Sequence, residues 1–545
     1  MNVPLTRSAQ LFQEGAQAEA AEDYLLALAK FSSSLELDGN QNKTWARIGS
    51  IFIRLGKWQQ AVDTFEFILK LEPDNGEAYH GLAMAYQQMG QAAQACSHID
   101  KAIQLRPDSS STALLHACIH AGADTDQANT LRLFRHWGER FADPLIKRTI
   151  PLKTDRTAGR PLNIGYISGD MREHSVAFFL APVFAHHNPQ SVHVSVFSTG
   201  AQKDAMTAHL KGLVPAWFNV ASLNDDALFT LIRKQKIDVL VDLSGHTEGQ
   251  RLQVFARRAA PVQVTWLGFM FTLGLKAMDY RLTDFAMDPP GNEKWYVEKL
   301  FRLHCMASYS PPPDTEMAED PPMLANDGPM LVSLNHSRKL TDEMLLLWRQ
   351  IMLLRPDCSL LLHVNESSLE DAVAAMQPRL EELEFPLDRI LISPHVPLQE
   401  FMQRGHIADI ALDTTPLSGG TTTLHALWMG LPVVAFEADV AVSSATANTL
   451  KSLGLDDWIA YDAPSYIAKV LALMDDPQAL KSHRATIRGK MEAGVLMDYP
   501  ARCKELERAY RLMWFNYLLD EPRYLDVGFD SDHELLAVNE ELQTN

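Results

Sequence analysis

The segment LDTTPLSGGTTTLHALWMGLPVV, residues 412–434, decides the fold of this chain of 545 residues. A short apolar strand ends at Asp413, and a turn rich in Pro, Ser and Gly follows it. A helix then leads into the apolar run LPVVAFE at residues 431–437. A strand, a helix and a second strand in direct succession predict one unit of a parallel α/β sheet.

The same segment predicts a binding site for anionic oxygens. Gly419 and Gly420 let the backbone approach a ligand closely, and Thr421, Thr422 and Thr423 stand where the helix begins. Threonine hydroxyls and the free N–H groups of a first helical turn bind phosphate oxygens. The alternative is a plain helix cap with a tight turn. Two glycines beside three threonines favour a phosphate cradle.

Apolar runs before this segment extend it into a whole domain. They are MLVSLNH (330–336), CSLLLHV (358–364), RILISPH (389–395) and IALDT (410–414). Strands of near-continuous apolar sequence that alternate with helices predict a parallel sheet covered on both faces. We expect a C-terminal Rossmann-like domain over residues 330–525 and an acidic tail over residues 526–545.

An earlier part of the chain predicts a second domain of the same kind. Its strand candidates are LNIGYISGD (162–170), HVSVFST (193–199), IDVLVDLSG (237–245) and PVQVTWLG (261–268). We expect an N-terminal Rossmann-like domain over residues 151–308, joined to the C-terminal one by a proline-rich acidic linker over residues 309–329. Two such halves form a ligand cleft between the carboxyl ends of their sheets, which is the GT-B architecture.

Residues 1–150 carry a repeat of 34 residues. Ala27, Ala61 and Ala95 occupy the same place in three successive units. This period, with small residues where helices must approach closely, is typical of tetratricopeptide (TPR) repeats, and residues 111–150 predict capping helices. An unrelated helical bundle is the alternative, which the residue-by-residue register disfavours. The expected fold is therefore a TPR α-solenoid followed by a GT-B pair of α/β domains.

The composition excludes several classes of protein. A formal charge of −19 and a pI of about 5.4 weigh against a nucleic-acid binder held by phosphate contacts. The five cysteines are scattered, without a CxxC pair, as is typical of reduced thiols in the cytosol. No uncharged apolar run reaches about 18 residues, the length of a membrane span. We expect a cytoplasmic protein without a nucleic-acid partner, a membrane span, a catalytic metal or another cofactor.

Further candidate residues follow the first strand of the C-terminal half. In LNHSRKL (334–340), Lys339 can reach a diphosphate as a point charge, and His336 can hydrogen-bond the diphosphate or a base. A lone lysine after a strand is equally consistent with a solvated surface residue.

Histidines also mark strand ends in the N-terminal half. SGDMREHS places His174 after the first strand, and LSGHTEG places His246 and Thr247 after another. A histidine in such a loop can act as a general base or donate a hydrogen bond to a substrate hydroxyl. A single loop histidine is more often structural, whereas two at one sheet edge favour a site.

The three repeats and five motifs together resemble the O-GlcNAc transferase/SPINDLY family. The motifs are GYISGDMREHS, LSGHTEGQRLQVFARRAAPVQVTWLG, MDYRLTD, LNHSRKL and LDTTPLSGGTTTLHALWMGLPVV. They stand in family order from about residue 8 to residue 520. The resemblance implies an inverting, metal-independent glycosyltransferase that moves GlcNAc from UDP-GlcNAc onto Ser/Thr of proteins. Its acceptors would bind in the TPR groove.

The resemblance also implies roles by position. His174 would be the catalytic base or a sugar contact, Lys339 would stabilise the leaving diphosphate, and His246 would belong to the acceptor-side motif. The donor-binding residues that it implies are His336, Lys339, Val396, Pro397, Gly420, Thr421, Thr422, Thr423 and His425. Stabilising the leaving-group charge matters more here than a strong base, which ranks Lys339 and the threonines above His174.

The chain departs from the family pattern around the nucleoside. Leu398 and Phe401 stand where animal members carry Lys and His to hold the uridine, and His425 stands where they carry an Asp to hold the ribose. The donor could therefore also be UDP-glucose or a GDP-sugar, and the acceptor could be a glycan. The alternative function is that of a TPR adaptor with a non-catalytic transferase half. The sequence also leaves homo-oligomerisation open.

Overall fold

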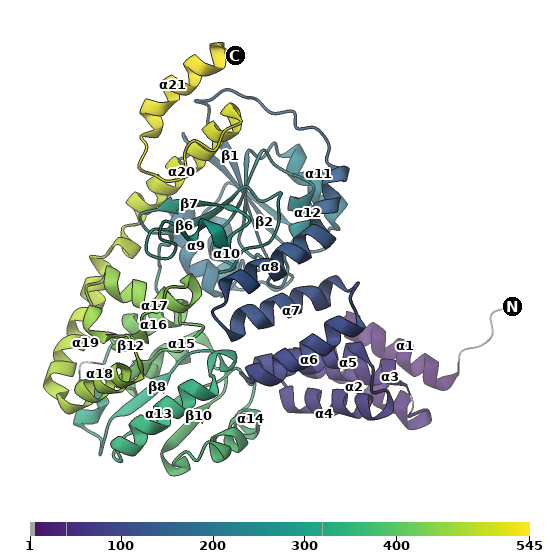
Figure 1. The fold of residues 1–545 in the computed structure, drawn as a ribbon, viewed down its shortest axis with the longest axis vertical. Coiled ribbons are helices and arrows are strands. Elements are labelled where there is room, and N and C mark those ends of the chain that lie inside the picture. Colours follow the sequence, from purple (N-terminus) through teal and green to yellow (C-terminus); the bar gives the residue numbers. More distant parts are fainter. Residues whose placement is uncertain (1–5, 40, 319, 545) are drawn as a thin grey trace.

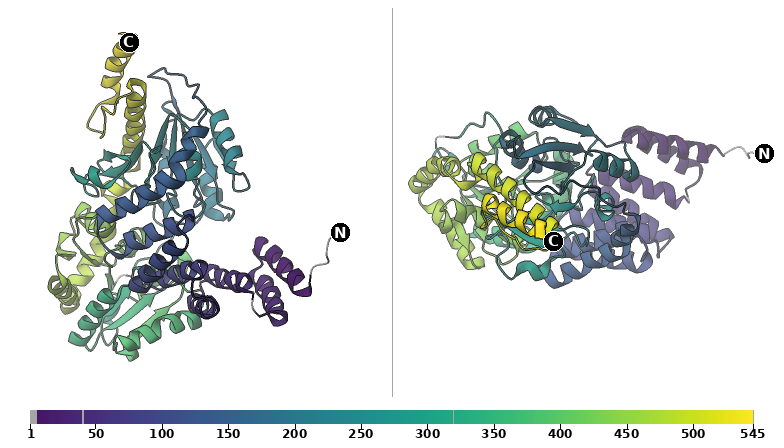
Figure 2. Two further views of the ribbon diagram at one scale, coloured as in Figure 1. Left: turned by 45° about the vertical axis from the view of Figure 1, so that its right-hand side comes forward. Right: turned by 90° about the horizontal axis from the view of Figure 1, so that it is seen from above.

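The computed structural model describes residues 6–39, 41–318 and 320–544. An arm of paired helices leads into two stacked α/β domains, the first in the upper half of Figure 1 and the second in the lower half. The arm projects sideways from the level where these two domains meet (Figures 1 and 2). This arrangement confirms the predicted TPR solenoid followed by a GT-B pair.

The arm consists of antiparallel helix pairs. Its helices are α1 (Arg7–Ala20), α2 (Tyr24–Leu37), α3 (Asn42–Arg54), α4 (Trp58–Leu71), α5 (Gly76–Gln88), α6 (Ala92–Leu105), α7 (Ser110–Ala123) and α8 (Gln127–Trp137). Ala27, Ala61 and Ala95, the repeated small residues, are fully buried. A Cβ on Gly49 would lie 2.6 Å from the ring of Phe65, so the small side chains allow the helices to approach. The last pair, α7 and α8, joins the repeats to the first α/β domain.

The first sheet is wholly parallel and has the strand order β3-β2-β1-β4-β5-β6-β7. Its strands are β1 (Leu162–Ser168), β2 (Val192–Ser198), β3 (Ala216–Asn219), β4 (Val239–Asp242), β5 (Val262–Thr265), β6 (Tyr280–Asp284) and β7 (Lys299–Leu303). The helices between them are α9 (Ser175–His186), α10 (Ala205–Gly212), α11 (Asp225–Lys234) and α12 (Leu252–Ala256). The order reverses between β1 and β4, and ligands bind beside such a switch point.

The second sheet repeats this topology in the order β10-β9-β8-β11-β12-β13. Its strands are β8 (Met330–Ser333), β9 (Ser359–His363), β10 (Ile390–Ser393), β11 (Ile410–Leu412), β12 (Val433–Phe436) and β13 (Ile459–Ala460). Its helices are α13 (Asp342–Leu354), α14 (Leu369–Glu382), α15 (Leu398–Phe401), α16 (Thr421–Trp428), α17 (Ala441–Ser452), α18 (Ala463–Asp475) and α19 (Pro477–Glu492). Its switch point lies between β8 and β11.

The C-terminal helices differ from the predicted domain boundary. α20 (Tyr499–Leu519) returns to the first domain, where the Tyr510 hydroxyl lies 3.0 Å from that of Tyr166 on β1. α21 (Ser531–Thr544), within the predicted acidic tail, is a helix that packs on α20 and buries Val538 completely. The apolar faces of both helices are therefore covered on the side of the first domain. The sequence had predicted instead that residues up to 525 belong to the second domain.

The repeats also pack directly on the second domain. Gly90, in the turn between α5 and α6 of the third repeat, has a φ of +73°, and an added Cβ would lie 2.5 Å from the carbonyl oxygen of Ser337. Arg379 of α14 donates to the carbonyl oxygens of Met89 at 3.1 Å and Leu340 at 2.7 Å. The TPR array therefore contacts the loop that follows β8. Among the described residues, no helix combines the length and apolar composition needed to cross a lipid bilayer.

Candidate functional site

The loops after β8 and β11 lie side by side at the switch point of the second sheet. β8 and β11 are neighbouring parallel strands, with Leu331 opposite Ile410. The carboxyl ends of parallel strands meet at one sheet edge. The motifs LNHSRKL and LDTTPLSGG, which are far apart in the sequence, therefore form one site.

A buried carboxylate organises the turn before α16. Oδ1 of Asp413 accepts hydrogen bonds from the N–H of Gly419 at 2.7 Å and from Nδ2 of Asn335 at 3.0 Å. Oδ1 of Asn335 accepts in turn from the hydroxyl of Thr422 at 2.9 Å. Asp413 is 3% exposed, and burial raises the pKa of its carboxyl. This network fixes the start of α16 relative to the loop after β8.

Lys339 points into this network from the short helix at Ser337–Lys339. Its Nζ donates to the carbonyl oxygen of Ser418 at 2.6 Å. The side chain is half-buried, and burial lowers the pKa of its ammonium group to about 8, against the opposing attraction of the Asp413 carboxylate. An ammonium group has three donors, so Lys339 keeps donors for a further acceptor such as a phosphate oxygen. At pH 7 it is a cation beside a helix N-terminus.

The three threonines of α16 do different things. The Thr423 hydroxyl is buried and hydrogen-bonds that of Thr446 at 2.8 Å, so it holds the helix to α17. Thr422 holds Asn335, and Thr421 is half-buried at the first position of the helix. An added Cβ on Gly420 would meet no atom within 4 Å, so the backbone there faces open space. The exposed part of the predicted phosphate cradle is therefore Gly420 and Thr421 with the backbone N–H groups of the first turn.

His425 lies at the contact between the two α/β domains. Its Nδ1 shares a 2.7 Å hydrogen bond with the Tyr309 hydroxyl, and its ring lies 5.1 Å from that of Phe178 on α9 and 6.1 Å from that of Phe401. Burial lowers the pKa of this histidine to about 3, so it is neutral at pH 7. A neutral imidazole among aromatic rings, one turn into α16, lies where the resemblance implies a nucleoside contact.

His336 and a further histidine, His363, lie close together at the same sheet edge. Nδ1 of His336 accepts from the N–H of Arg338 at 3.2 Å. Burial lowers the pKa of His336 to about 3, and the positive charges of Arg338 and Lys339 and the nearby His363 act in the same direction. His363 ends β9, is 6% exposed and has an Nδ1 without a protein partner in the described structure. Sequence reasoning missed His363, although it ends the run CSLLLHV.

The remaining donor-side candidates lie in the loop after β10. Val396 is half-buried and packs against the core of the second domain, whereas Pro397 is exposed and precedes α15. Leu398 also packs against this core, and Phe401 is 8% exposed. The loop therefore offers mainly apolar surface and backbone groups to a ligand.

His174 is the first-domain candidate at the cleft. It caps α9, where its Nδ1 accepts from the N–H of Val176 at 3.3 Å, so the neutral ring carries its proton on Nε2. Nε2 lies 3.8 Å from Oδ1 of Asp170. Burial lowers the pKa of His174, although Asp170 opposes this effect. In this orientation the ring donates from Nε2, so accepting a proton from a substrate requires the ring to turn.

The starts of α9 and α16 both lie near the contact between the two α/β domains. His174 stands four residues before Phe178, and Thr421 stands four residues before His425. Because the Phe178 and His425 rings are in contact, both helix starts lie within about one helical turn of that contact. The structure therefore places His174 and the Lys339 network on different α/β domains, both near the Phe178–His425 contact.

His246 lies elsewhere, at the junction of the repeats and the first domain. Its Nε2 donates to the carbonyl oxygen of Leu273 at 2.9 Å, and its ring stacks on Phe134 of α8 at 5.3 Å. Trp137 and Phe269 flank it, and burial lowers its pKa to about 4. These contacts favour a packing role, and its catalytic role stays a prediction.

A small, partly open hollow of about 20 Å³ lies where the repeats and both α/β domains meet. It is lined by residues from the α7–α8 turn, the first domain and the start of α17, among them Thr125, Phe271, Tyr296 and Val442. In the described structure, the side-chain clusters that could hold a metal ion are Asp100–His116–His120 and His187–Cys503–Glu507. Neither includes a residue of the cleft.

Comparisons with known proteins agree with this architecture. A model of glycosyl transferase family 41 matches residues 145–307 and 322–506, and a tetratricopeptide repeat model matches residues 52–117. A mutant of the Thermobaculum terrenum O-GlcNAc transferase has a similar solved structure. Its TM-score is 0.86 at 31% identity, over 95% of this chain and 100% of that one.

Curated plant proteins are also similar. The SPINDLY protein of Oryza sativa subsp. japonica, named a probable UDP-N-acetylglucosamine–peptide N-acetylglucosaminyltransferase, is 32% identical over 428 residues, which are 77% of this chain and 46% of that protein. Its Arabidopsis thaliana counterpart is 32% identical over 71% of this chain and 43% of its own length. The chain thus spans less than half the length of these relatives. The family match covers more than half of the chain, and the chain belongs to glycosyl transferase family 41.

Proposed function

We propose that this protein transfers GlcNAc from UDP-GlcNAc to Ser or Thr hydroxyls of protein acceptors, with inversion and without a metal ion. The observation that carries the proposal is the position of Lys339, a cation hydrogen-bonded to Ser418 beside the exposed start of α16. Relatives named as UDP-N-acetylglucosamine–peptide N-acetylglucosaminyltransferases support the donor and the acceptor class.

The site favours departure of a diphosphate. In an inverting transfer, the acceptor oxygen bonds to the anomeric carbon while the bond from that carbon to the diphosphate oxygen breaks. Negative charge then grows on the diphosphate, where Lys339 and the N–H groups of Gly420 and Thr421 can stabilise it. The acceptor hydroxyl loses its proton on the side of the first domain, where His174 is the candidate base once its ring turns. No metal ion is required to balance the charge.

Acceptors would approach past the repeats. The α7–α8 turn lines a small hollow together with the start of α17. Val442 of that helix accepts a hydrogen bond at its carbonyl oxygen from the N–H of Ser418, in the turn before α16, at 3.1 Å. An extended peptide held by the TPR array could therefore place a hydroxyl near the cleft. The proposal adds no cofactor beyond the nucleotide-sugar.

A different donor is the second candidate, and one observation favours it. The nucleoside side of the cleft presents the apolar residues Leu398 and Phe401 and a neutral His425 held by Tyr309. These side chains lack the charged groups that the resemblance implies for uridine and ribose recognition. A GDP-sugar or UDP-glucose would then replace UDP-GlcNAc while the diphosphate contacts stay the same.

The test is a donor panel on the purified full-length chain. UDP, GDP and their sugars are compared for thermal stabilisation, and GlcNAc, glucose and fucose transfer to a peptide library is followed by mass spectrometry. We expect stabilisation by UDP and UDP-GlcNAc and the addition of GlcNAc to Ser/Thr. Transfer from a GDP-sugar alone would favour the second candidate. Stabilisation by none of the nucleotides would overturn the enzyme function and leave an adaptor.

A further inference from the structure

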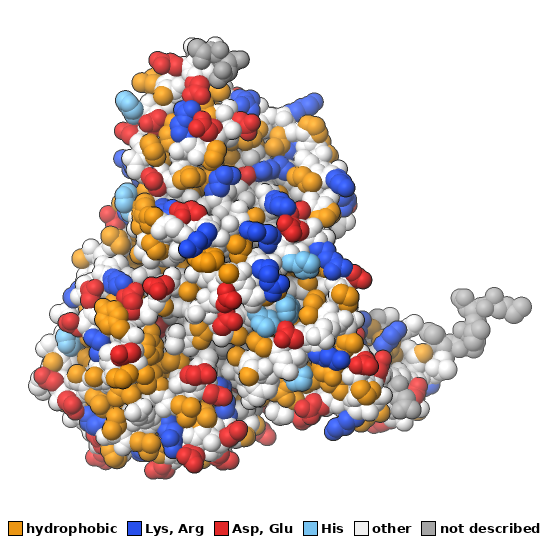
Figure 3. All heavy atoms as spheres, viewed as in Figure 1, with side chains coloured by type: hydrophobic (Ala, Val, Ile, Leu, Met, Phe, Trp, Pro, Cys, Tyr) orange, Lys and Arg blue, Asp and Glu red, His pale blue; other side chains and the backbone are white. Residues whose placement is uncertain are grey.

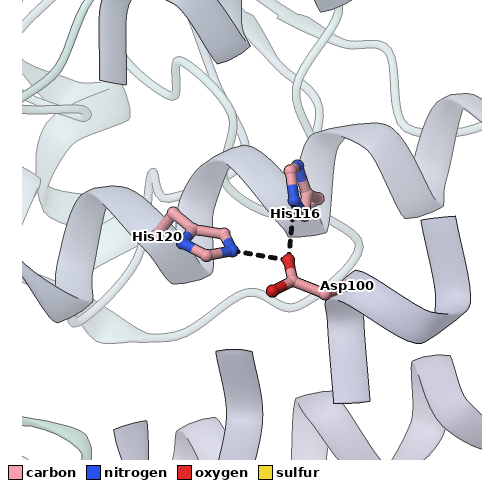
Figure 4. A group of neighbouring side chains, drawn as sticks. All are labelled: Asp100, His116 and His120. Carbon is pink, nitrogen blue, oxygen red and sulfur yellow. Dashed lines mark hydrogen bonds and ion pairs between the residues drawn. The ribbon is translucent and has the colours of Figure 1, made fainter. Parts of the chain in front are cut away.

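Three side chains on the last TPR helix and the capping helix converge outside the cleft (Figure 4). Nε2 of His116 lies 3.0 Å from Oδ1 of Asp100, and Nε2 of His120 lies 2.8 Å from the same oxygen. The two imidazole rings are 4.7 Å apart. Two nitrogen atoms and a carboxylate oxygen therefore point at one small volume between α6 and α7.

The helix geometry explains this convergence. His116 and His120 are four residues apart on α7, so both project from the same face of that helix. Asp100 reaches them from the neighbouring α6. The side chains of the histidines are 17% and 20% exposed and that of Asp100 is 49% exposed. In the space-filling view, histidine side chains come to the surface where α7 runs (Figure 3). An ion from solvent can therefore reach the cluster.

The distances between the three ligand atoms suit a tetrahedrally coordinated ion after a small movement of the side chains. Bonds of about 2.0 Å from nitrogen or oxygen to Zn²⁺ separate neighbouring ligand atoms by about 3.3 Å. The two observed nitrogen–oxygen separations of 3.0 and 2.8 Å are shorter by only a few tenths of an ångström. The half-exposed side chain of Asp100 can move that far without disturbing the backbone.

We propose that Asp100, His116 and His120 bind a late first-row divalent metal ion of the Zn²⁺ class, with a fourth position open to water. Two imidazoles and one carboxylate are a common donor set for Zn²⁺, whereas Ca²⁺ and Mg²⁺ require mostly oxygen ligands. The nearby cation Arg132 is exposed and donates to Asn129 at 2.7 Å, so solvent screens its charge. The competing explanation is a hydrogen-bonded triad that binds no ion.

The ion would connect the repeats to the donor side of the cleft. It bridges α6, the last helix of the third repeat, and α7, which continues to Gly122. A Cβ on Gly122 would lie 3.5 Å from Cδ1 of Leu417, a residue of the turn that Asp413 organises. Fixing α7 against α6 therefore also restrains the face of α7 that contacts this turn.

Zinc titration of the full-length, tag-free chain after chelator treatment tests the proposal. Calorimetry should show one Zn²⁺ per chain, and Zn²⁺ should raise Tm. His116→Ala, His120→Ala and Asp100→Asn should each weaken binding by at least about tenfold. The matched control His136→Ala removes an exposed histidine from the neighbouring α8 and should bind Zn²⁺ as the parent does.

Two further measurements separate metal binding from loss of folding. Asp100→Asn keeps the side-chain volume and an oxygen acceptor, so this variant should retain its circular dichroism spectrum while losing affinity. Co²⁺ should give visible absorption bands with the parent chain and none with the His116→Ala/His120→Ala double variant. Absence of Zn²⁺ binding, or equal binding by the parent and the double variant, would overturn the proposal and favour the hydrogen-bonded triad.

Discussion

The ammonium group of Lys339 donates a 2.6 Å hydrogen bond to the carbonyl oxygen of Ser418. This bond joins the loop after β8 to the loop after β11 and directs the remaining Nζ donors towards the start of α16. The hydrogen bond from Asn335 to Asp413 joins the same two loops, and Asp413 also accepts from the N–H of Gly419.

Replacing Lys339 with alanine should strongly lower the kcat of sugar transfer with little loss of stability. The half-buried side chain contributes a charge and one hydrogen bond to the site. Loss of a group that stabilises a leaving charge costs about 10²–10³-fold in kcat. Turnover and Tm are measured together, with Lys211→Ala, an exposed lysine on α10, as the control. Full activity of Lys339→Ala would falsify the leaving-group assignment.

Binding of UDP should weaken as the pH rises through about 8. The pKa of Lys339 in the free protein is about 8, so the group that we propose attracts the diphosphate is charged below this pH and neutral above it. The Kd of UDP, measured by calorimetry from pH 7 to pH 9, should therefore increase. In Lys339→Ala this increase should disappear. A pH dependence that persists in the variant would assign the effect to another group and contradict the proposed diphosphate contact of Lys339.

Gly419→Ala should destabilise the protein by about 1–3 kcal/mol. An added Cβ would lie 2.2 Å from the Thr423 hydroxyl oxygen and 2.9 Å from Oδ1 of Asp413, both of which are buried and hydrogen-bonded. Gly489→Ala is the matched control, because a Cβ at that exposed position of α19 meets no atom within 4 Å. Denaturant unfolding compares the two variants. Equal free energies of unfolding would mean that the turn before α16 can accommodate the added Cβ without loss of stability.

His425→Asp, which introduces the residue type of the animal relatives, should reduce stability by about 2–4 kcal/mol near neutral pH. The new carboxylate would be buried among the rings of Phe178, Tyr309 and Phe401. Burial raises the pKa of a carboxyl above its value in the unfolded chain, so the loss should grow as the pH rises from 5 to 8. His425→Asn, which cannot ionise, should show a smaller loss without this pH dependence. Unfolding curves at several pH values provide the test.

Arg379→Ala should loosen the repeats from the second domain and lower both stability and turnover. The guanidinium group is buried and donates to the carbonyl oxygens of Met89 and Leu340 and to Asp342. Leaving these acceptors unpaired costs about 2–4 kcal/mol. Arg349→Ala, which removes a more exposed arginine paired with Glu384, should have little effect. Limited proteolysis between the repeats and the α/β domains should be faster only in the Arg379 variant.

Local patterns in the sequence predicted most of the architecture. The 34-residue register of Ala27, Ala61 and Ala95 predicted the helix pairs, because helix packing requires small residues at fixed intervals. Alternating apolar strands and helices predicted both sheets, since a strand covered on both faces needs apolar residues throughout. The Gly-Gly-Thr-Thr-Thr turn, which is a local signal, predicted the start of α16 at Thr421. The role of Lys339 in binding a diphosphate stays a prediction.

Other parts of the site depend on contacts between residues distant in the sequence. Asn335 and His363 carried no signal that separated them from other strand-end polar residues, and only the strand order brings them beside Asp413 and His336. Tyr309, within the predicted linker, contacts His425 because the two domains close on each other.

By itself the sequence determined the repeat, the two α/β domains and the residue types that can bind a diphosphate. These properties depend on hydrophobic periodicity and on turn chemistry, which act over a few residues. Only the tertiary structure decided that α20 belongs to the first domain, that His246 packs against α8 and that Lys339 binds Ser418. Each of these facts depends on which surfaces become buried together, and burial acts between segments that the sequence separates by tens to hundreds of residues.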